Sequence, residues 1–221
     1  MANRRSDARP QLQAMGTACV VSGGLGLVAG VVTLAYPAAV PEEQWSYPFT
    51  FAVGLAMGVG LAITHVLTLL GVRALQLTVA DEGRRAAQAG LWVALTGFAL
   101  LAGCELASGL IGRAALEDAG AQGLSSAFGV ASLMTAMGSI IAGAVIRRGR
   151  AAAAAPWLLA SGIAMIVLVT PANISGNPTF RMVALMLWSL CFVGLGLAVR
   201  RLPARTPSAV RATRNGGIFA E

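Results

Sequence analysis

Six long apolar stretches alternate with short polar segments along the chain. Each stretch is close to the ~20 residues that an α-helix needs to cross the hydrocarbon core of a bilayer. The pattern predicts an all-α fold, a polytopic bundle of six transmembrane helices whose connections are too short for an extramembrane domain. The predicted helices cover residues 12–35, 49–72, 91–112, 125–146, 153–171 and 180–199.

The composition excludes an ordinary soluble domain. Of the 221 residues, 57% are hydrophobic and only 11% are charged, whereas a soluble domain carries about a quarter charged residues. Membrane lipid is therefore expected to cover most of the surface. The net charge of +7 does not indicate nucleic-acid binding, because the arginines cluster at helix ends and in the C-terminal tail, where they orient helices and attract anionic head groups.

All sixteen basic residues are arginines, and their distribution predicts the topology. Fourteen fall on one side of the predicted helices, and only Arg113 and Arg181 fall on the other. Because positive charge collects in cytoplasmic loops, both termini are expected in the cytoplasm. The chain then divides into a basic N-terminal tail (1–11), the transmembrane domain (12–199) and a basic C-terminal tail (200–221) that we expect to be disordered.

Small residues recur along three of the predicted helices at the spacing of a helix–helix seam. Close backbone approach at small residues drives helix association in membranes, where burial of leucine gives no advantage. A 3.5-residue period on the first and fourth helices indicates left-handed helix pairs. The residues expected to pack are Gly16, Gly23, Gly26 and Gly30 on the first helix, Gly54 and Gly58 on the second, and Gly129, Ser132, Ser139 and Gly143 on the fourth.

A shift of 113 residues carries the stripe of the first helix onto that of the fourth, which runs in the opposite direction. Such a relation is typical of a 3+3 inverted repeat. Two observations favour chance instead: the chain is rich in Gly and Ala, and the shift does not carry the second helix cleanly onto the fifth.

Two ionisable residues lie at membrane depth, where such groups are costly and are functional candidates by default. His65 shares a helix face with Gly54 and Gly58, and Glu105 shares one with Gly109, so both are expected to point into the bundle. The helix rise places them on the order of 14 Å apart along the membrane normal. We therefore expect no direct contact between them.

Arg181, at the outer start of the sixth helix, is the expected partner of Glu105, with Arg113 as the alternative. The pair would form a structural clamp or one wall of an outward-facing binding site. The neighbouring segment 170–178 contains two prolines and two asparagines, including Asn173. We expect a loop there, and a broken helix around a solute is the alternative.

No catalytic, cofactor-binding or metal-ligating pattern is present in the sequence. It contains one histidine, no phosphate-binding loop and no pair of carboxylates sharing a helix face at membrane depth. Its three cysteines lie in separate apolar stretches and are expected to be packing residues. An intramembrane enzyme is therefore the least favoured class, and no cofactor or metal is expected.

The stretch Trp45-Ser46-Tyr47-Pro48-Phe49 before a helix with His65, the third-helix Glu105, and Thr170-Pro171 followed by Arg181 resemble a pattern in uncharacterised six-helix bacterial integral membrane proteins. That resemblance implies a helical bundle and no particular activity. The plan is also similar to the substrate-binding subunits of energy-coupling-factor importers, whose small-x-x-x-small contacts Ala14-Met15-Gly16-Thr17-Ala18 would supply. The excess of arginine, alanine and glycine is typical of a GC-rich bacterial genome and favours the inner membrane.

Two hypotheses for the function follow. The first is a non-enzymatic multi-pass protein that acts by associating with other membrane components, which include lipids, a second copy of the chain or another membrane protein. The second is a small-solute binding or transport subunit with a site between helices near His65 or Glu105.

Overall fold

The computed structural model describes residues 8–202, and within that range the regular elements are helical. Residues 1–7 and 203–221, which hold most of the two predicted basic tails, lie outside the described residues. The six candidate membrane spans are those predicted from the hydropathy pattern. Their elements are α1 (Ala8–Ala35), α2 (Phe51–Val79), α3 (Arg85–Leu110), α4 (Ala119–Val145), the segment formed by α5 (Ala155–Ala164), η3 (Met165–Val169) and α6 (Thr170–Ile174), and α7 (Pro178–Arg200).

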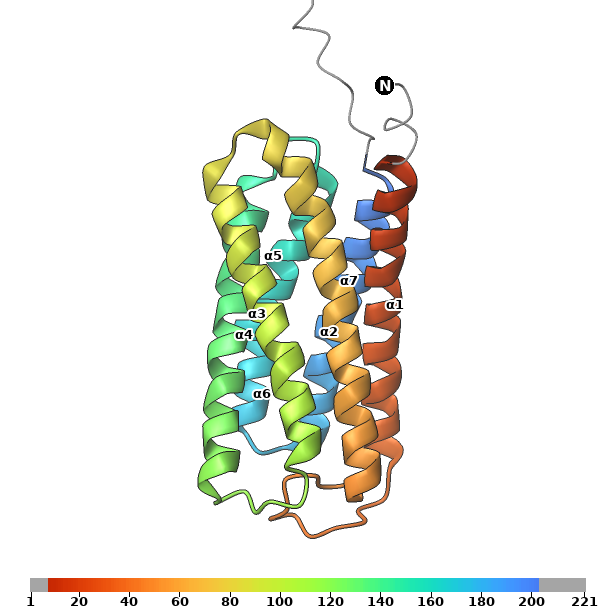
Figure 1. Cartoon of the computed structure of the whole chain (residues 1–221), viewed down its shortest axis with the longest axis vertical. Helices are drawn as coiled ribbons and strands as arrows, with labels where there is room; N and C mark the ends of the chain where they lie inside the picture. Colours follow the sequence, from red (N-terminus) through yellow and green to blue (C-terminus); the bar gives the residue numbers. More distant parts are fainter. Residues whose placement is uncertain (1–7, 203–221) are drawn as a thin grey trace, which may run out of the picture.

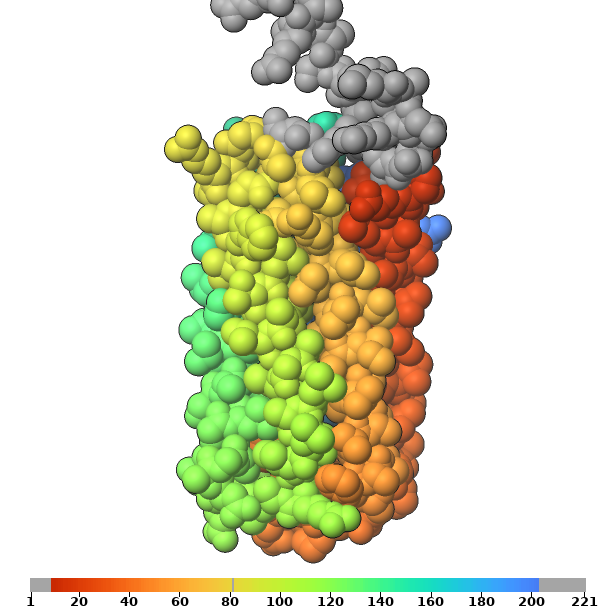
Figure 2. Space-filling view, in the orientation of Figure 1, coloured from red at the N-terminus to blue at the C-terminus, as the bar shows by residue number. Residues whose placement is uncertain are grey.

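The helices stand side by side in one bundle, alternating in direction (Figure 1). Each helix packs on its neighbours in the chain, and α7 returns to pack along α1, which closes the ring. We call the end that holds the start of α1 and the end of α7 the terminal end, and the opposite end the distal end. The space-filling view shows α2 and α3 in contact along their length, with no opening between them on this face (Figure 2).

The observed helices extend beyond the apolar stretches, mainly at the terminal end. The short 3₁₀ turns η1 (Ala80–Glu82) and η2 (Ala152–Ala154) complete the connections at this end. Arg73, expected in a loop, lies within α2, where its guanidinium carbon is 5.7 Å from the Trp92 ring centroid. Hydropathy identifies only the part of a helix that lies in the hydrocarbon core, so the observed helices are longer than the predicted ones.

Large apolar side chains point outward from the helices all around the bundle. Val28 on α1 is 59% exposed, Leu133 on α4 is 58% exposed and Val167 in η3 is 59% exposed. Outward apolar side chains together with buried small and polar ones are the pattern of a helix bundle surrounded by lipid. The fold is that of a multi-pass membrane protein.

The fifth span contains a π-helical turn just before Pro171. Proline cannot donate a backbone hydrogen bond and its ring collides with the preceding turn of an α-helix. The wider turn at Met165–Val169 accommodates it, and the Thr170 hydroxyl donates to the Met165 carbonyl at 2.9 Å. The chain therefore stays helical to Ile174, so the expectation of a loop from Thr170 onward is wrong for its first five residues.

Small residues let α1 approach the backbone of α7. A Cβ atom on Gly23 would lie 2.7 Å from the Ser189 carbonyl oxygen, and one on Gly16 would lie 2.8 Å from that of Gly196. Gly26 and Gly30 face α7 in the same way. The stripe predicted on the first helix is thus the α1–α7 contact surface.

The stripe predicted on the fourth helix is only partly a contact surface. Ser139 is fully buried and Gly143 packs on α5, but Ser132 is half-buried and Gly129 is exposed, with no atom within 4 Å of the place a Cβ would take. The expectation is wrong at Gly129 because no helix among residues 8–202 lies opposite it. The α3–α4 contact instead follows a neighbouring stripe, which includes Thr135, Gly138 and Ala142.

The two stripes that suggested an inverted repeat therefore have different neighbours. The stripe of α1 faces α7, whereas Gly143 in the stripe of α4 faces α5. The superposition of small residues in the sequence is not matched by equivalent contacts.

Two loops are joined at the distal end by backbone hydrogen bonds. Between the α1–α2 loop and the α3–α4 loop, Trp45 donates to Ala114 at 2.9 Å and Leu116 donates to Glu43 at 2.8 Å. The Trp45 indole also donates to the Ser108 hydroxyl at 2.8 Å. These bonds hold the distal ends of four helices together.

Charged side chains join two connections at the terminal end. The Glu82 carboxylate lies 3.0 Å from Nε of Arg84 and accepts the backbone N–H of Arg150 at 2.9 Å. Arg84 also donates to the Val145 carbonyl at 2.8 Å. The α2–α3 connection is thereby fixed to the α4–α5 connection.

Candidate functional site

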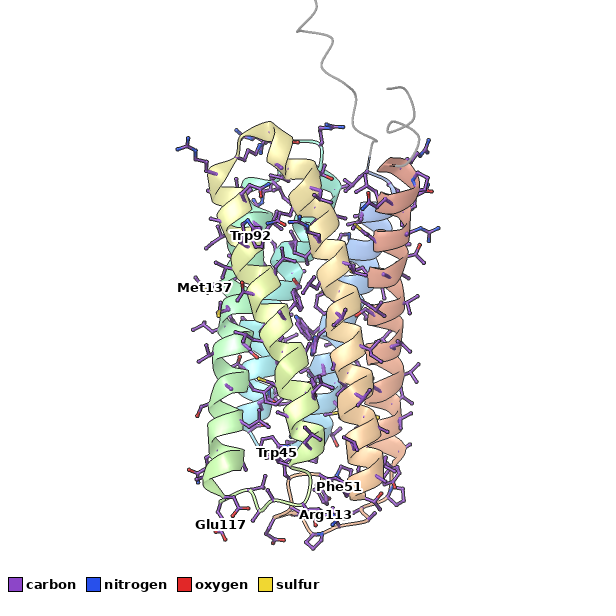
Figure 3. All side chains as sticks on the ribbon, viewed as in Figure 1. Trp45, Phe51, Trp92, Arg113, Glu117 and Met137 are labelled. Carbon is purple, nitrogen blue, oxygen red and sulfur yellow. The ribbon has the colours of Figure 1, made fainter. Side chains whose placement is uncertain are left out.

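His65 and Glu105 meet inside the bundle. Nε2 of His65 on α2 lies 3.7 Å from Oε1 of Glu105 on α3, and the two side chains are only 10% and 18% exposed. The expectation that they lie too far apart for contact is therefore wrong. The interior therefore contains an imidazole and a carboxylate contributed by two neighbouring helices; Figure 3 shows the side chains of the whole bundle.

The directions of the side chains explain the error. Gly58 lies beside the backbone of Glu105, and His65 follows seven residues later, which is about 10 Å along the helix. Side chains lean toward the N-terminus of their own helix. Because α2 and α3 are antiparallel, the imidazole leans toward the distal end and the carboxylate toward the terminal end, and they meet.

Glycines bring the two helices close enough for this contact. A Cβ on Gly58 would lie 2.6 Å from the Glu105 carbonyl oxygen and 3.1 Å from the Cα of Gly109. Gly54, one turn earlier, faces Ser46 of the α1–α2 loop instead. The Gly54–Gly58 face is thus a contact surface, and Gly58 is the member that positions the polar pair.

Two aromatic side chains lie close to the imidazole of His65. The ring centroid of His65 is 6.3 Å from that of Phe98 and 6.1 Å from that of Trp188. Phe192 packs edge-on against Trp188 at 4.6 Å. Phe98, Trp188 and Phe192 are all buried, so this aromatic cluster fills the interior at the level of His65.

Hydropathy and charge do not distinguish these aromatic residues in the sequence. Their spacing carries a signal: Phe98 precedes Glu105 by seven residues and Arg181 precedes Trp188 by seven residues. Two turns of a helix return to nearly the same face, so each charged residue shares a face with an aromatic residue of the cluster. A charged residue that lies seven positions from a buried aromatic residue on the same helix is therefore expected to face the interior.

Arg181 lies on the interior face of α7, about 10 Å toward the distal end from Trp188. Its Nε atom is buried and has no hydrogen-bond partner among the described residues. It makes no ion pair with Glu105 within 4 Å, so the expected clamp is not formed. The physical reason is again direction: α7 starts at the distal end, so the guanidinium leans distally while the Glu105 carboxylate leans the other way.

Asn173 lies on α6 with an exposed side chain, away from the polar pair. The neighbouring Asn177 has a structural role instead, because its side chain accepts the backbone N–H of Phe180 at 3.0 Å and caps α7. The predicted turn-forming segment therefore contributes a helix cap, and Asn173 is not part of the interior site.

Hydroxyl groups fasten α1 to α2 beside the site. The Ser22 hydroxyl donates to the Thr64 carbonyl and lies 2.6 Å from the Thr68 hydroxyl. Thr64 precedes His65 directly, so these bonds fix the part of α2 that carries the imidazole. The three cysteines are buried free thiols, and the described residues contain no group of three His, Cys, Asp or Glu side chains that could hold a metal ion.

The arrangement places an imidazole beside a carboxylate between α2 and α3. At 3.7 Å, Nε2 and Oε1 are within ion-pair range but beyond hydrogen-bond range, so each can still contact a third group. Comparison of the chain with protein family models, curated proteins and solved structures found no match.

Proposed function

We propose that this protein is a small-solute binding or transport subunit of the bacterial plasma membrane, with its site in the distal half of the bundle. The observation that carries the proposal is the 3.7 Å approach of His65 and Glu105 within a lipid-embedded fold. Ionisable groups inside a membrane are rare and costly, and they mark solute and proton pathways in most proteins that keep them.

The charges suggest the class of solute. Glu105 and Arg181 occupy interior faces of α3 and α7, one heptad toward the distal end from Phe98 and Trp188, whose ring centroids are 6.3 Å apart. The carboxylate and the guanidinium therefore bracket the same level of the interior without pairing with each other. A small zwitterion would place its cationic group on Glu105 and its anionic group on Arg181, and would offset both buried charges.

The distal end is the expected route of access. The aromatic cluster fills the interior at the level of His65, so a solute that reaches Glu105 and Arg181 enters from the distal side. The distribution of arginines favours a position of that side outside the cytoplasm. The site would thus face the exterior, with His65 and the aromatic rings as its floor.

Thermal unfolding of the purified protein in detergent tests this proposal, because a ligand that binds only the folded state raises its stability. Millimolar amino-acid zwitterions, simple amines and simple carboxylates would be compared. We expect zwitterions to raise the unfolding temperature most, and the Glu105→Gln and Arg181→Gln variants to lose that rise.

Two exposed charges serve as matched controls, since Glu117→Gln and Arg147→Gln change the same residue types outside the interior. Both controls should keep the response of the unchanged protein. The proposal fails if no zwitterion stabilises the protein, or if Glu105→Gln and Arg181→Gln respond as the controls do.

A second candidate function, association with another membrane protein, is favoured by the distal half of α4. Gly120, Gly123 and Gly129 have no atom within 4 Å of their Cβ positions. Small exposed residues on a lipid-facing helix allow close approach of a second helix. We propose a second copy of the chain as the first partner to test: Gly129→Leu should convert an oligomer to a monomer in light scattering, and a monomeric unchanged protein would argue against a second copy.

A further inference from the structure

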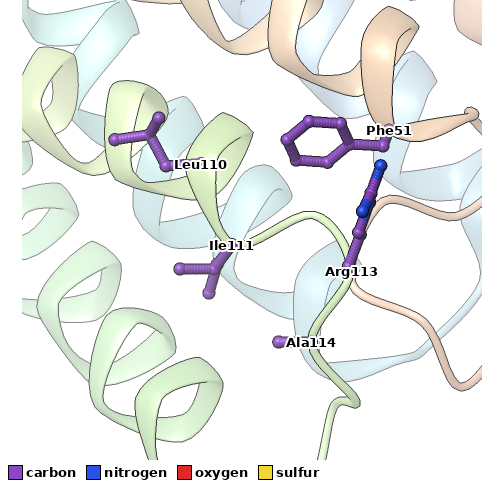
Figure 4. Close-up of a pocket in the computed structure, with 5 residues that line it drawn as sticks. All are labelled: Phe51, Leu110, Ile111, Arg113 and Ala114. Atoms are coloured by element: carbon purple, nitrogen blue, oxygen red, sulfur yellow. The ribbon is translucent and has the colours of Figure 1, made fainter.

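A hollow of about 410 Å³ lies at the distal end, between the start of α2 and the end of α3 (Figure 4). Its walls are mainly apolar, with one guanidinium at the rim. The lining residues are Phe51, Leu110, Ile111, Arg113 and Ala114. Neither His65 nor Glu105 lines it, so it is separate from the interior site.

Arg113 is held over this hollow by an aromatic ring. Its guanidinium carbon lies 4.6 Å from the centroid of the Phe51 ring. Figure 4 shows the two side chains next to each other. A cation over a ring face is attracted by the quadrupole of the ring, which fixes the guanidinium without using its hydrogen-bond donors. The donors therefore stay available for a ligand.

No carboxylate of the described residues lies within 4 Å of Arg113 in an ion pair, although its loop carries acidic groups. Asp118 instead accepts the backbone N–H of Ala115 at 2.8 Å. Glu117, also labelled at this end in Figure 3, is exposed. The two distal loops hold four acidic residues and one arginine, namely Glu42, Glu43, Glu117, Asp118 and Arg113.

The apolar wall reaches into the lipid-facing surface. Leu110 is the last residue of α3 and is 69% exposed, and Ile111 follows it. The end of a membrane span is the level at which phospholipid head groups meet their acyl chains. A ligand in this hollow is thus in contact with both a cation and hydrocarbon.

We propose that the hollow binds one phospholipid of the leaflet at the distal end, with its phosphate on Arg113 and an acyl chain along Leu110. Guanidinium binds phosphate through a planar fork of two donors, which favours phosphate among anions. The surrounding acidic residues favour a head group that also carries an ammonium, as in phosphatidylethanolamine. They disfavour one with a net negative charge, as in phosphatidylglycerol.

Native mass spectrometry of the full chain in a mild detergent tests the site, with phosphatidylethanolamine, phosphatidylglycerol or inorganic phosphate added. The unchanged protein should retain phosphatidylethanolamine most strongly. Arg113→Gln should weaken that binding about tenfold, the loss of one charge-assisted contact. The side chains of Arg113 and Leu110 are exposed, so substitutions at either position should leave the fold intact.

Leu110→Gln isolates the contribution of the apolar wall, and Arg147→Gln, at the terminal end, is the matched arginine control. We expect Leu110→Gln to weaken phospholipid binding and Arg147→Gln to leave it unchanged. Equal binding by the unchanged protein and Arg113→Gln would overturn the proposal. So would stronger retention of phosphatidylglycerol, full competition by inorganic phosphate, or no effect of Leu110→Gln, because each outcome describes a different site.

Discussion

Glycines in the two halves of α4 have opposite surroundings. In the terminal half, a Cβ on Gly138 would lie 2.6 Å from the Gly90 carbonyl oxygen and 2.8 Å from the Cα of Ala94. In the distal half, Gly123 and Gly129 have no neighbour within 4 Å. A small residue in a membrane helix is therefore a structural requirement only where another backbone lies opposite it. Elsewhere it leaves a bare surface.

The strongest test of this difference is a large side chain at each position. Gly138→Leu must push α3 away from α4 and should destabilise the protein by about 3 kcal/mol or more, since a methylene forced into a packed seam already costs ~1–3 kcal/mol. Gly129→Leu should leave the folded monomer intact. The yield of monodisperse protein and its unfolding temperature in detergent measure both, and similar losses for the two variants would contradict the comparison.

Adjacent glycines on α1 extend the comparison to a second helix. Gly23→Leu should cost about 1–3 kcal/mol because its side chain meets α7, whereas Gly24→Leu should be neutral because no atom lies within 4 Å of its Cβ position. Chemical unfolding in detergent reports both. If Gly24→Leu destabilises the protein as much as Gly23→Leu does, contact with α7 is not the cause of the loss.

The contact between His65 and Glu105 extends the comparison from backbone contacts to side-chain contacts. A double-mutant cycle of His65→Gln and Glu105→Gln should give a coupling of about 1 kcal/mol, the usual size for residues in contact. Glu105→Gln with Arg181→Gln should be additive without solute, and a strong coupling there would mean that the clamp forms after all.

The smallest effect is expected at the terminal end. Glu82→Gln weakens the contacts with Arg84 and the backbone of Arg150 and should cost about 1 kcal/mol, because partly exposed ion pairs contribute little. Unfolding temperature measures it, with the exposed Glu117→Gln as the control. If Glu82→Gln lowers the free energy of unfolding more than Gly23→Leu does, this contact rather than the glycine seams dominates stability.

Hydropathy and residue size predicted the six spans and the α1 seam, because both depend on the period of one helix. They did not predict the contact of His65 with Glu105, which depends on the relative direction of two helices and the lean of two side chains. They also did not predict that Gly129 is exposed, since a stripe of small residues does not indicate whether another helix lies opposite it. The π-helical turn before Pro171 was missed because a proline ordinarily indicates the end of a helix.

The paired distal loops have a mechanical consequence. Backbone bonds between residues 43–46 and 112–116 fasten α1, α2, α3 and α4 into one stiff arc, while the 175–177 connection makes only local backbone bonds among those described. The seam between α1 and α7 is closed by glycines. We expect any separation of helices at the distal end to begin beside the 175–177 connection, outside this arc.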